Sequence, residues 1–313
     1  MKEQMKAISQ DELGGPEVLE LVTLPTPEPG VSEILVRVHA ASMNPVDAMN
    51  RESGLFIGQP PFVLGWDVSG TVEAVGLGVT LYAPGDEVFG MLPFPHGHGA
   101  HAQYAVGPTR VFVPKPDRLD HVQAAAIPMV GLTAWQALVE TAHVGEGSRV
   151  LINGAAGGVG HVAVQIAKTR GAHVIALASA ANADFVRSLG ADEAIDYTAT
   201  DFTEVVGDLD VVLEVIGGDY PAKTLEVLKS GGTLVSTLLD TLVPLAKDAA
   251  NRGIRLAGLL VEADRIGMSS LADLVAAGTL VPTIAATFAF GEAAAAQSAK
   301  AGPGKVVLTF PTS

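Results

Sequence analysis

The sequence contains no cysteine in 313 residues. This absence excludes disulfide bonds, thiolate zinc sites and a cysteine nucleophile. A metal site would have to be built from histidine and carboxylate side chains instead.

Long apolar runs and excess positive charge are also missing. No stretch approaches the roughly 20 apolar residues that a bilayer-spanning helix needs, and the start, MKEQMKAISQDE, has no apolar signal core. We therefore expect a cytoplasmic protein without a membrane partner. The 19 basic against 34 acidic residues give a net charge of −15, which argues against nucleic acid and anionic membranes and indicates a soluble, self-repelling surface.

The sequence has enough apolar residues for a large core: 48% are hydrophobic. The length suggests about two domains. Up to about residue 115, short alternating segments separated by glycine and proline predict a barrel or sandwich. From Val150 onward, strands alternate with helices, which predicts a doubly wound parallel sheet. The expected parallel strands are 150–152, 174–178, 194–197, 210–215, 233–237 and 255–261.

The segment 150–171 is the most informative one in the chain. An apolar strand leads into a turn with the spacing G-x-x-G-x-x-G, at Gly154, Gly157 and Gly160, and an amphipathic helix follows. Such a turn presents backbone N–H groups and a positive helix end to a phosphate. We expect Ala156, Gly157, Gly158 and Val159 to contact a dinucleotide. The alternative is a glycine-rich turn that binds no ligand.

The end of the second parallel strand indicates which dinucleotide is bound. NAD-binding sheets place an acidic residue there to hold the ribose 2′-hydroxyl. Here the strand ends at Ala178-Ser179, and the next acidic residue is Asp184. A carboxylate would repel a 2′-phosphate, so its absence beside Ser179 predicts NADPH. Ile216 and Ser236 lie at the ends of the fourth and fifth expected strands, at the same carboxyl edge, where ligands bind.

Several motifs in order along the chain resemble one family. They are ASMNPVD at 41–47, LGWDVSGTV at 64–72, GLTA at 131–134, NGAAGGVG at 153–160 and GKVVL at 304–308. The chain resembles the medium-chain dehydrogenase/reductase superfamily, specifically its zinc-free quinone oxidoreductase branch. The resemblance implies a GroES-like catalytic domain (1–120), a Rossmann domain (121–262) and a C-terminal return to the catalytic domain (263–313). It also implies an interdomain cleft and a homodimer.

The resemblance further implies roles for individual residues. Asn44 would lie near the nicotinamide and hydrogen-bond a substrate carbonyl, while Asp47 would fix its loop. Trp66 would wall the pocket or stack on a flat substrate, unless it is a core aromatic. The other implied cofactor contacts are Thr133 at the phosphate or ribose, Tyr197 near the 2′-phosphate and Leu260 near the carboxamide. For the apolar positions, simple core packing is the alternative.

A metal is not expected. The positions that match the zinc ligands of related enzymes hold Asn44 and Trp66-Asp67. His96, His98 and His101 form the one tempting cluster, but a metal site needs a complete and oriented shell. We expect a loop of solvated histidines there.

The residues and the resemblance together predict an NADPH-dependent, zinc-independent reductase of quinones or α,β-unsaturated carbonyls. None of the four tyrosines is a convincing general acid. The final proton would come from water or from a histidine within 96–101. The alternatives are a reductase of a biosynthetic enoyl or imine intermediate, and a low-turnover NADPH-binding sensor or structural protein.

Overall fold

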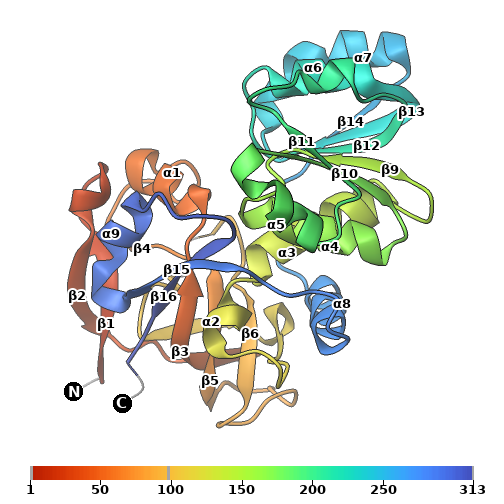
Figure 1. Cartoon of the computed structure of the whole chain (residues 1–313). Helices are drawn as coiled ribbons and strands as arrows, with labels where there is room; N and C mark the ends of the chain where they lie inside the picture. Colours follow the sequence, from red (N-terminus) through yellow and green to blue (C-terminus); the bar gives the residue numbers. More distant parts are fainter. Residues whose placement is uncertain (1–2, 97–98, 312–313) are drawn as a thin grey trace. The chain divides into compact units, whose positions relative to one another are not determined.

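The chain forms two compact units, which are described separately (Figure 1). The computed structural model describes residues 3–96 and 99–311. The first unit, here the β-rich unit, contains the chain up to Leu132, Glu262–Gly278 and the segment from Pro282 onward. The second, the α/β unit, contains Thr133–Val261 and Thr279–Val281.

The boundary between the units lies after Leu132, whereas the sequence analysis placed it after residue 120. Two contacts explain the difference. Helix α2 (His121–Ala125) packs on strands β3 (Glu33–Ser42) and β5 (Asp67–Val75) of the β-rich unit. At the start of α3 (Pro128–Trp135), the backbone N–H of Met129 donates to the Asp67 carboxylate at 2.7 Å.

The β-rich unit is built on two sheets. The smaller has the order β2-β1-β4, and the larger has the order β15-β16-β3-β5-β6-β8, with β7 paired to β3. Strand β16 therefore brings the C-terminal segment against β3, with Leu308 opposite Ala41. The remaining strands are β1 (Gln4–Gln10), β2 (Glu20–Pro25), β4 (Phe62–Val63), β6 (Glu87–Met91), β7 (Tyr104–Pro108), β8 (Phe112–Pro114), β15 (Ile284–Ala289) and β16 (Lys305–Thr309).

Helix α1 (Pro45–Ser53) follows β3 directly and was not expected from the sequence. Its start is well specified, since Pro45 occupies the first turn and the Asp47 carboxylate accepts the backbone N–H of Asn44 at 2.6 Å. Its end is the left-handed Gly54, at φ 65°. The other helices of this unit are α8 (Arg265–Ala276) and α9 (Ala293–Ser298).

The α/β unit contains a six-stranded, wholly parallel sheet in the order β11-β10-β9-β12-β13-β14. Helices α4 and α5 cover one face, and α6 and α7 cover the other (Figure 1). The strands are β9 (Arg149–Ile152), β10 (His173–Ala178), β11 (Glu193–Asp196), β12 (Leu209–Glu214), β13 (Leu228–Ser236) and β14 (Arg255–Gly258). The helices are α4 (Gly158–Thr169), α5 (Ala183–Ser188), α6 (Tyr220–Val227) and α7 (Ala246–Arg252), and a π-helical segment (Gln136–Thr141) continues α3.

Each unit buries its own apolar residues. Trp66, Phe89 and Phe112 are fully buried in the β-rich unit, and Leu151, Leu177 and Leu234 are fully buried in the α/β sheet. The predicted fold class, a β-rich domain together with a doubly wound parallel sheet, is therefore confirmed.

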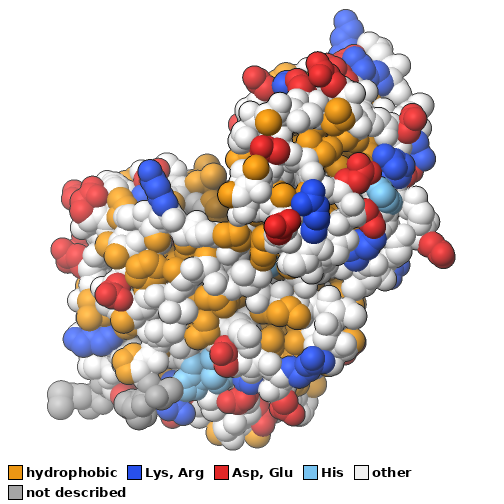
Figure 2. All heavy atoms as spheres, viewed as in Figure 1, with side chains coloured by type: hydrophobic (Ala, Val, Ile, Leu, Met, Phe, Trp, Pro, Cys, Tyr) orange, Lys and Arg blue, Asp and Glu red, His pale blue; other side chains and the backbone are white. Residues whose placement is uncertain are grey.

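Charged side chains lie across the surface of both units (Figure 2). Acidic side chains are scattered over the visible face rather than gathered in one patch (Figure 2). None of the helices in the described part of the chain is both long and apolar enough to cross a membrane.

Candidate functional site

The glycine turn joins β9 to α4 in the α/β unit. Gly154 has a positive φ of 68°, and its carbonyl accepts the N–H of Gly157 at 2.9 Å. A Cβ at Gly160 would lie 2.1 Å from the Gly154 carbonyl oxygen and 2.6 Å from the Cα of Ala155. The turn can close this tightly only because Gly160 has no side chain.

The N-terminus of α4 is open. Its N-cap residue is Gly157, which is exposed and provides no side-chain cap. The first N–H groups of a helix have no partner within the helix, so an uncapped start favours an anion. The predicted residues Ala156, Gly157, Gly158 and Val159 form this start, and a dinucleotide pyrophosphate fits it.

Two buried polar side chains tie neighbouring strand ends together beside this turn. Asn153, at the end of β9, donates to the Glu214 carboxylate at 2.6 Å. Glu214, at the end of β12, also accepts the N–H groups of Ile216 at 2.6 Å and Gly217 at 2.7 Å. This pair was not predicted from the sequence, although a carboxylate at the end of an apolar strand is a visible signal.

The other predicted cofactor residues of this unit lie at or after the ends of the parallel strands, except Thr133, which lies in α3. Ile216, Leu260 and Tyr197 are 52%, 40% and 47% exposed, so core packing does not account for them. Ser236 is buried, and its hydroxyl accepts the N–H of Leu238 at 3.0 Å. Thr133 is also buried. Their contacts with a cofactor stay predictions.

A carboxylate does lie near Ser179, contrary to the expectation from the sequence. Asp196 ends β11 and pairs in register with Ala178, the residue before Ser179. Hydrogen bonds from the Thr198 hydroxyl and backbone, with a further one from the Ala180 backbone, lower the pKa of Asp196. Asp196 is therefore ionised at neutral pH. The expectation of no acidic group here considered only β10, but the parallel pairing supplies one from β11.

The β-rich unit contains a buried group that we call the polar cluster: Ser42, Asn44, Asp47, Asp67 and Lys305. The Asp67 carboxylate accepts the Ser42 hydroxyl at 2.5 Å and the Asn44 side-chain amide at 2.8 Å. The Lys305 ammonium donates to the Asn44 side-chain oxygen at 2.6 Å and to the Met43 carbonyl at 2.5 Å, and lies 4.0 Å from Asp67. Three segments far apart in sequence thus meet here.

Burial shifts the ionisation of this cluster. Desolvation raises the pKa of Asp47 to about 7, although the Asn44 backbone N–H and the charge of Lys305 oppose it. Desolvation also lowers the pKa of Lys305, against the attraction of Asp67 and Asp47. One oxygen of Asp47, Oδ1, has no hydrogen-bond partner among the described residues.

Trp66 lies next to the cluster in sequence but belongs to the core. Its ring is fully buried, its indole N–H donates to the His96 carbonyl at 2.7 Å, and its edge meets Phe94 at a centroid distance of 5.2 Å. The ring supports the surrounding loop. Its predicted role as a pocket wall stays untested.

The histidine loop differs from the expected set of solvated side chains. His96 is exposed, as expected, and His98 lies outside the described residues. His101, however, is 1% exposed, and its backbone N–H donates to the Leu64 carbonyl at 2.9 Å. Desolvation lowers the pKa of His101 to about 4, with a smaller contribution from Lys305. The expectation was wrong for His101 because pairing with residue 64 draws it into the core.

His101 should make the β-rich unit sensitive to acid. Its pKa rises from about 4 in the folded chain to the ordinary 6.5 on unfolding. Between these values the unfolded chain binds a proton that the folded chain does not. The contribution of His101 to stability should therefore fall by about 3 kcal/mol in total as the pH falls from 6.5 to 4. The raised pKa of Asp47 acts in the opposite direction, so the effect of His101 is read as the difference between the parent and the variant.

The test is urea unfolding at several pH values, followed by Trp66 fluorescence in a Trp135→Phe background. His101→Gln should remove this part of the pH dependence, whereas His143→Gln, at an exposed position, should retain it. An unchanged pH dependence in His101→Gln would contradict the assignment.

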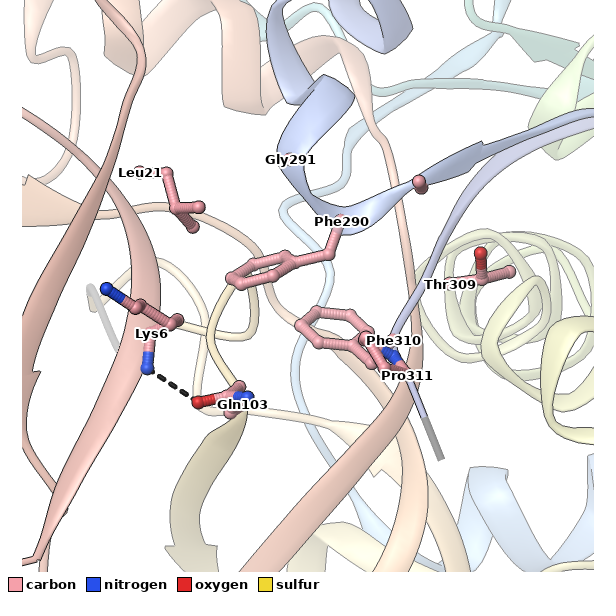
Figure 3. Close-up of a pocket in the computed structure, with 9 residues that line it drawn as sticks. Lys6, Leu21, Gln103, Phe290, Gly291, Thr309, Phe310 and Pro311 are labelled. Carbon is pink, nitrogen blue, oxygen red and sulfur yellow. Dashed lines mark hydrogen bonds between the residues drawn. The ribbon is translucent and has the colours of Figure 1, made fainter. Parts of the chain in front are cut away.

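A cavity of about 480 Å³ lies elsewhere in the β-rich unit (Figure 3). Phe290 and Phe310 lie side by side in it, with ring centroids 4.4 Å apart, and Lys6 and Gln103 form another wall. None of the predicted site residues lines this cavity.

Comparisons with known proteins agree with both units. The alcohol dehydrogenase GroES-like domain matches residues 30–117, and the zinc-binding dehydrogenase family matches residues 189–308. The mitochondrial NAD(P)H oxidoreductase of Mus musculus is 34% identical over 305 residues, covering 83% of this chain and 76% of the relative.

Two further relatives extend this agreement. The chloroplastic NADPH-dependent alkenal/one oxidoreductase of Arabidopsis thaliana is 37% identical over 243 residues, covering 74% of this chain and 62% of that protein. The structure of the quinone oxidoreductase from Coxiella burnetii is 36% identical, with a TM-score of 0.91 and coverage of 98% of this chain and 99% of that one. The chain therefore belongs to the medium-chain dehydrogenase/reductase superfamily, in its quinone oxidoreductase-like branch.

Proposed function

We propose that this NAD(P)H-dependent oxidoreductase uses NADPH, needs no zinc, and transfers hydride to quinones or α,β-unsaturated carbonyls. The observation that carries the proposal is the uncapped N-terminus of α4 at Gly157. The absence of a side chain at Gly160 lets the preceding turn pack closely against this helix start. Relatives named as quinone and alkenal/one oxidoreductases support the substrate class.

The α/β unit would hold the cofactor. The backbone from Ala156 to Val159 would bind the pyrophosphate, and Ser179 and Tyr197 would contact the adenosine ribose and its phosphate. Thr133, Ile216, Ser236 and Leu260 would contact the rest of the dinucleotide. When bound, the reduced nicotinamide supplies the hydride.

In the β-rich unit, Asn44 would contact the nicotinamide and orient the substrate carbonyl. Its side-chain N–H would donate to the carbonyl oxygen and stabilise the negative charge that develops there. Hydride addition to an enone gives an enolate, which takes up one proton to complete the reduction. We assign that proton to water or to the exposed His96, because the side chains of Asp47 and His101 are both buried.

Zinc independence is supported by the donor atoms of the polar cluster. The side-chain oxygen of Asn44 binds Lys305, both oxygens of Asp67 accept hydrogen bonds, and Trp66 offers no ligand atom. In the described ranges 3–96 and 99–311, no group of three or more histidine or carboxylate side chains is placed to hold a metal.

The test is NADPH consumption with a panel of quinones and enones, together with metal analysis of the chelator-treated protein. We expect turnover without metal. Stoichiometric zinc that is required for turnover would contradict zinc independence. Tight NADPH binding without turnover of any panel member would favour a low-turnover binding protein, and turnover restricted to enoyl thioesters or imines would favour a biosynthetic reductase.

Asp196 should limit the preference for NADPH. A carboxylate near the 2′-phosphate repels it, while NADH carries no such charge. Asp196→Asn should therefore tighten NADPH binding by about threefold to tenfold, a modest effect because solvent screens this partly exposed charge. It should not tighten NADH binding, because a carboxylate can hold the 2′-hydroxyl of NADH. Fluorescence titrations with both cofactors measure this, and Asp184→Asn serves as the control. Equal effects on both cofactors would place Asp196 away from the 2′ position.

Homodimeric assembly and a cytoplasmic location complete the proposal and rest on the sequence alone. Sedimentation of the purified chain tests the first, and imaging of the tagged chain tests the second.

A further inference from the structure

The side-chain amide of Asn44 is held on both sides by groups of opposite hydrogen-bonding character. On one side the Lys305 ammonium donates to its oxygen at 2.6 Å. On the other side the Asp67 carboxylate accepts from its nitrogen at 2.8 Å. An ammonium only donates and a carboxylate only accepts, so the chemistry of the two neighbours fixes which end of the amide is which.

These two hydrogen bonds leave the Asn44 side chain with one free group for a ligand, its second N–H. Its oxygen already accepts a charged donor, and one N–H is used by Asp67. The second N–H has no protein partner among the described residues, and Asn44 as a whole residue is 7% exposed. Toward a ligand, Asn44 is therefore a hydrogen-bond donor.

Lys305 is held beside Asn44 by its burial and by a second hydrogen bond. It begins the final strand β16, is 3% exposed, and also donates to the Met43 carbonyl at 2.5 Å. The Asp67 carboxylate, 4.0 Å away, favours the charged form of Lys305 against the desolvation that lowers its pKa. A cation bound to the amide oxygen polarises the amide and strengthens donation from its N–H.

We propose that Lys305 is the positioning residue that makes Asn44 a dedicated donor, so that the site selects substrates presenting a carbonyl oxygen. The inference rests on the proposed function and extends it to a named residue outside the ASMNPVD segment. Lys305 acts through Asn44 and does not touch the substrate.

The test compares Lys305→Met and Lys305→Arg with Lys300→Met, which removes an exposed lysine near the same end of the chain. With NADPH and an enone, Lys305→Met should lower kcat/KM about 10- to 100-fold, as expected for losing a charge-assisted hydrogen bond. Lys305→Arg should recover part of this loss because it restores a donor. Lys300→Met should match the parent protein.

A second measurement does not depend on turnover. In protein labelled with ¹⁵N at asparagine side chains, Asn44→Ala identifies the Asn44 amide resonances. Lys305→Met should shift these resonances, and Lys300→Met should not. Urea unfolding followed by Trp66 fluorescence measures the stability of the β-rich unit in each variant and shows whether the variant is folded.

The outcomes separate the inference from the proposed function. If the parent protein shows no turnover, the proposed function is contradicted. The Asn44 amide resonances would still test whether Lys305 hydrogen-bonds Asn44. Unshifted Asn44 resonances in folded Lys305→Met would overturn the inference. It would also be overturned if kcat/KM of Lys305→Met stayed within about twofold of the parent, since the lost hydrogen bond would then have no functional effect.

Discussion

Gly157→Ala is expected to weaken binding of NADPH and NADH at least about tenfold while leaving the α/β unit folded. Its φ of −78° is allowed for alanine, and the added Cβ would lie 3.2 Å from the Gly154 carbonyl oxygen, a contact that a small shift relieves. The methyl group would instead occupy space at the exposed helix start, where backbone N–H groups must approach a phosphate closely. Fluorescence titration with each cofactor measures the loss.

Two other glycines in the same unit make the comparison specific. In Gly160→Ala the Cβ would lie 2.1 Å from the Gly154 carbonyl oxygen. This clash cannot be relieved by a side-chain rotation, because the contacted atom belongs to the backbone. This variant should lose about 3 kcal/mol of stability as well as cofactor binding. In Gly207→Ala the Cβ meets nothing within 4 Å, so both properties should be unchanged. Full binding by Gly157→Ala would show that the pyrophosphate lies elsewhere.

The second large effect is expected at Asp67, the acceptor on which the polar cluster depends. Asp67→Asn keeps the size of the side chain but removes the charge that balances Lys305. It also places an amide where the Ser42 hydroxyl, the Asn44 amide and the Met129 N–H all donate. Breaking a buried charge pair by removing one partner costs about 3–5 kcal/mol. Urea unfolding followed by Trp66 fluorescence measures this cost in the β-rich unit.

The matched comparison is the surface pair of Arg37 and Glu73, which are 3.5 Å apart and partly exposed. Glu73→Gln should cost no more than about 1 kcal/mol, because solvent screens the charge. The double variant Asp67→Asn with Lys305→Met should lose less stability than the sum of the two single changes, since it leaves no unpaired lysine. Additive losses would show that the two side chains do not interact.

Much of this arrangement could be predicted from local sequence patterns. Short apolar strands with regular spacing and the G-x-x-G-x-x-G turn predicted the parallel sheet and the start of α4, because these signals depend on neighbouring residues along the chain. Helix α1 was missed, since it is short and polar, although Pro45, Asp47 and Gly54 are its ordinary start and stop signals.

The sequence by itself determined the two-domain organisation, the parallel sheet, the glycine turn before α4 and the absence of thiolate chemistry. The tertiary structure decided the environment of each polar side chain. It buried His101, brought Asp196 beside Ser179 through the pairing of β10 with β11, and joined Lys305 to Asn44 across 261 positions of sequence. Such contacts depend on strand register and long-range packing, which residue spacing along one chain does not encode. The open helix start at Gly157 is a local feature, whereas the donor character of Asn44 is a tertiary one.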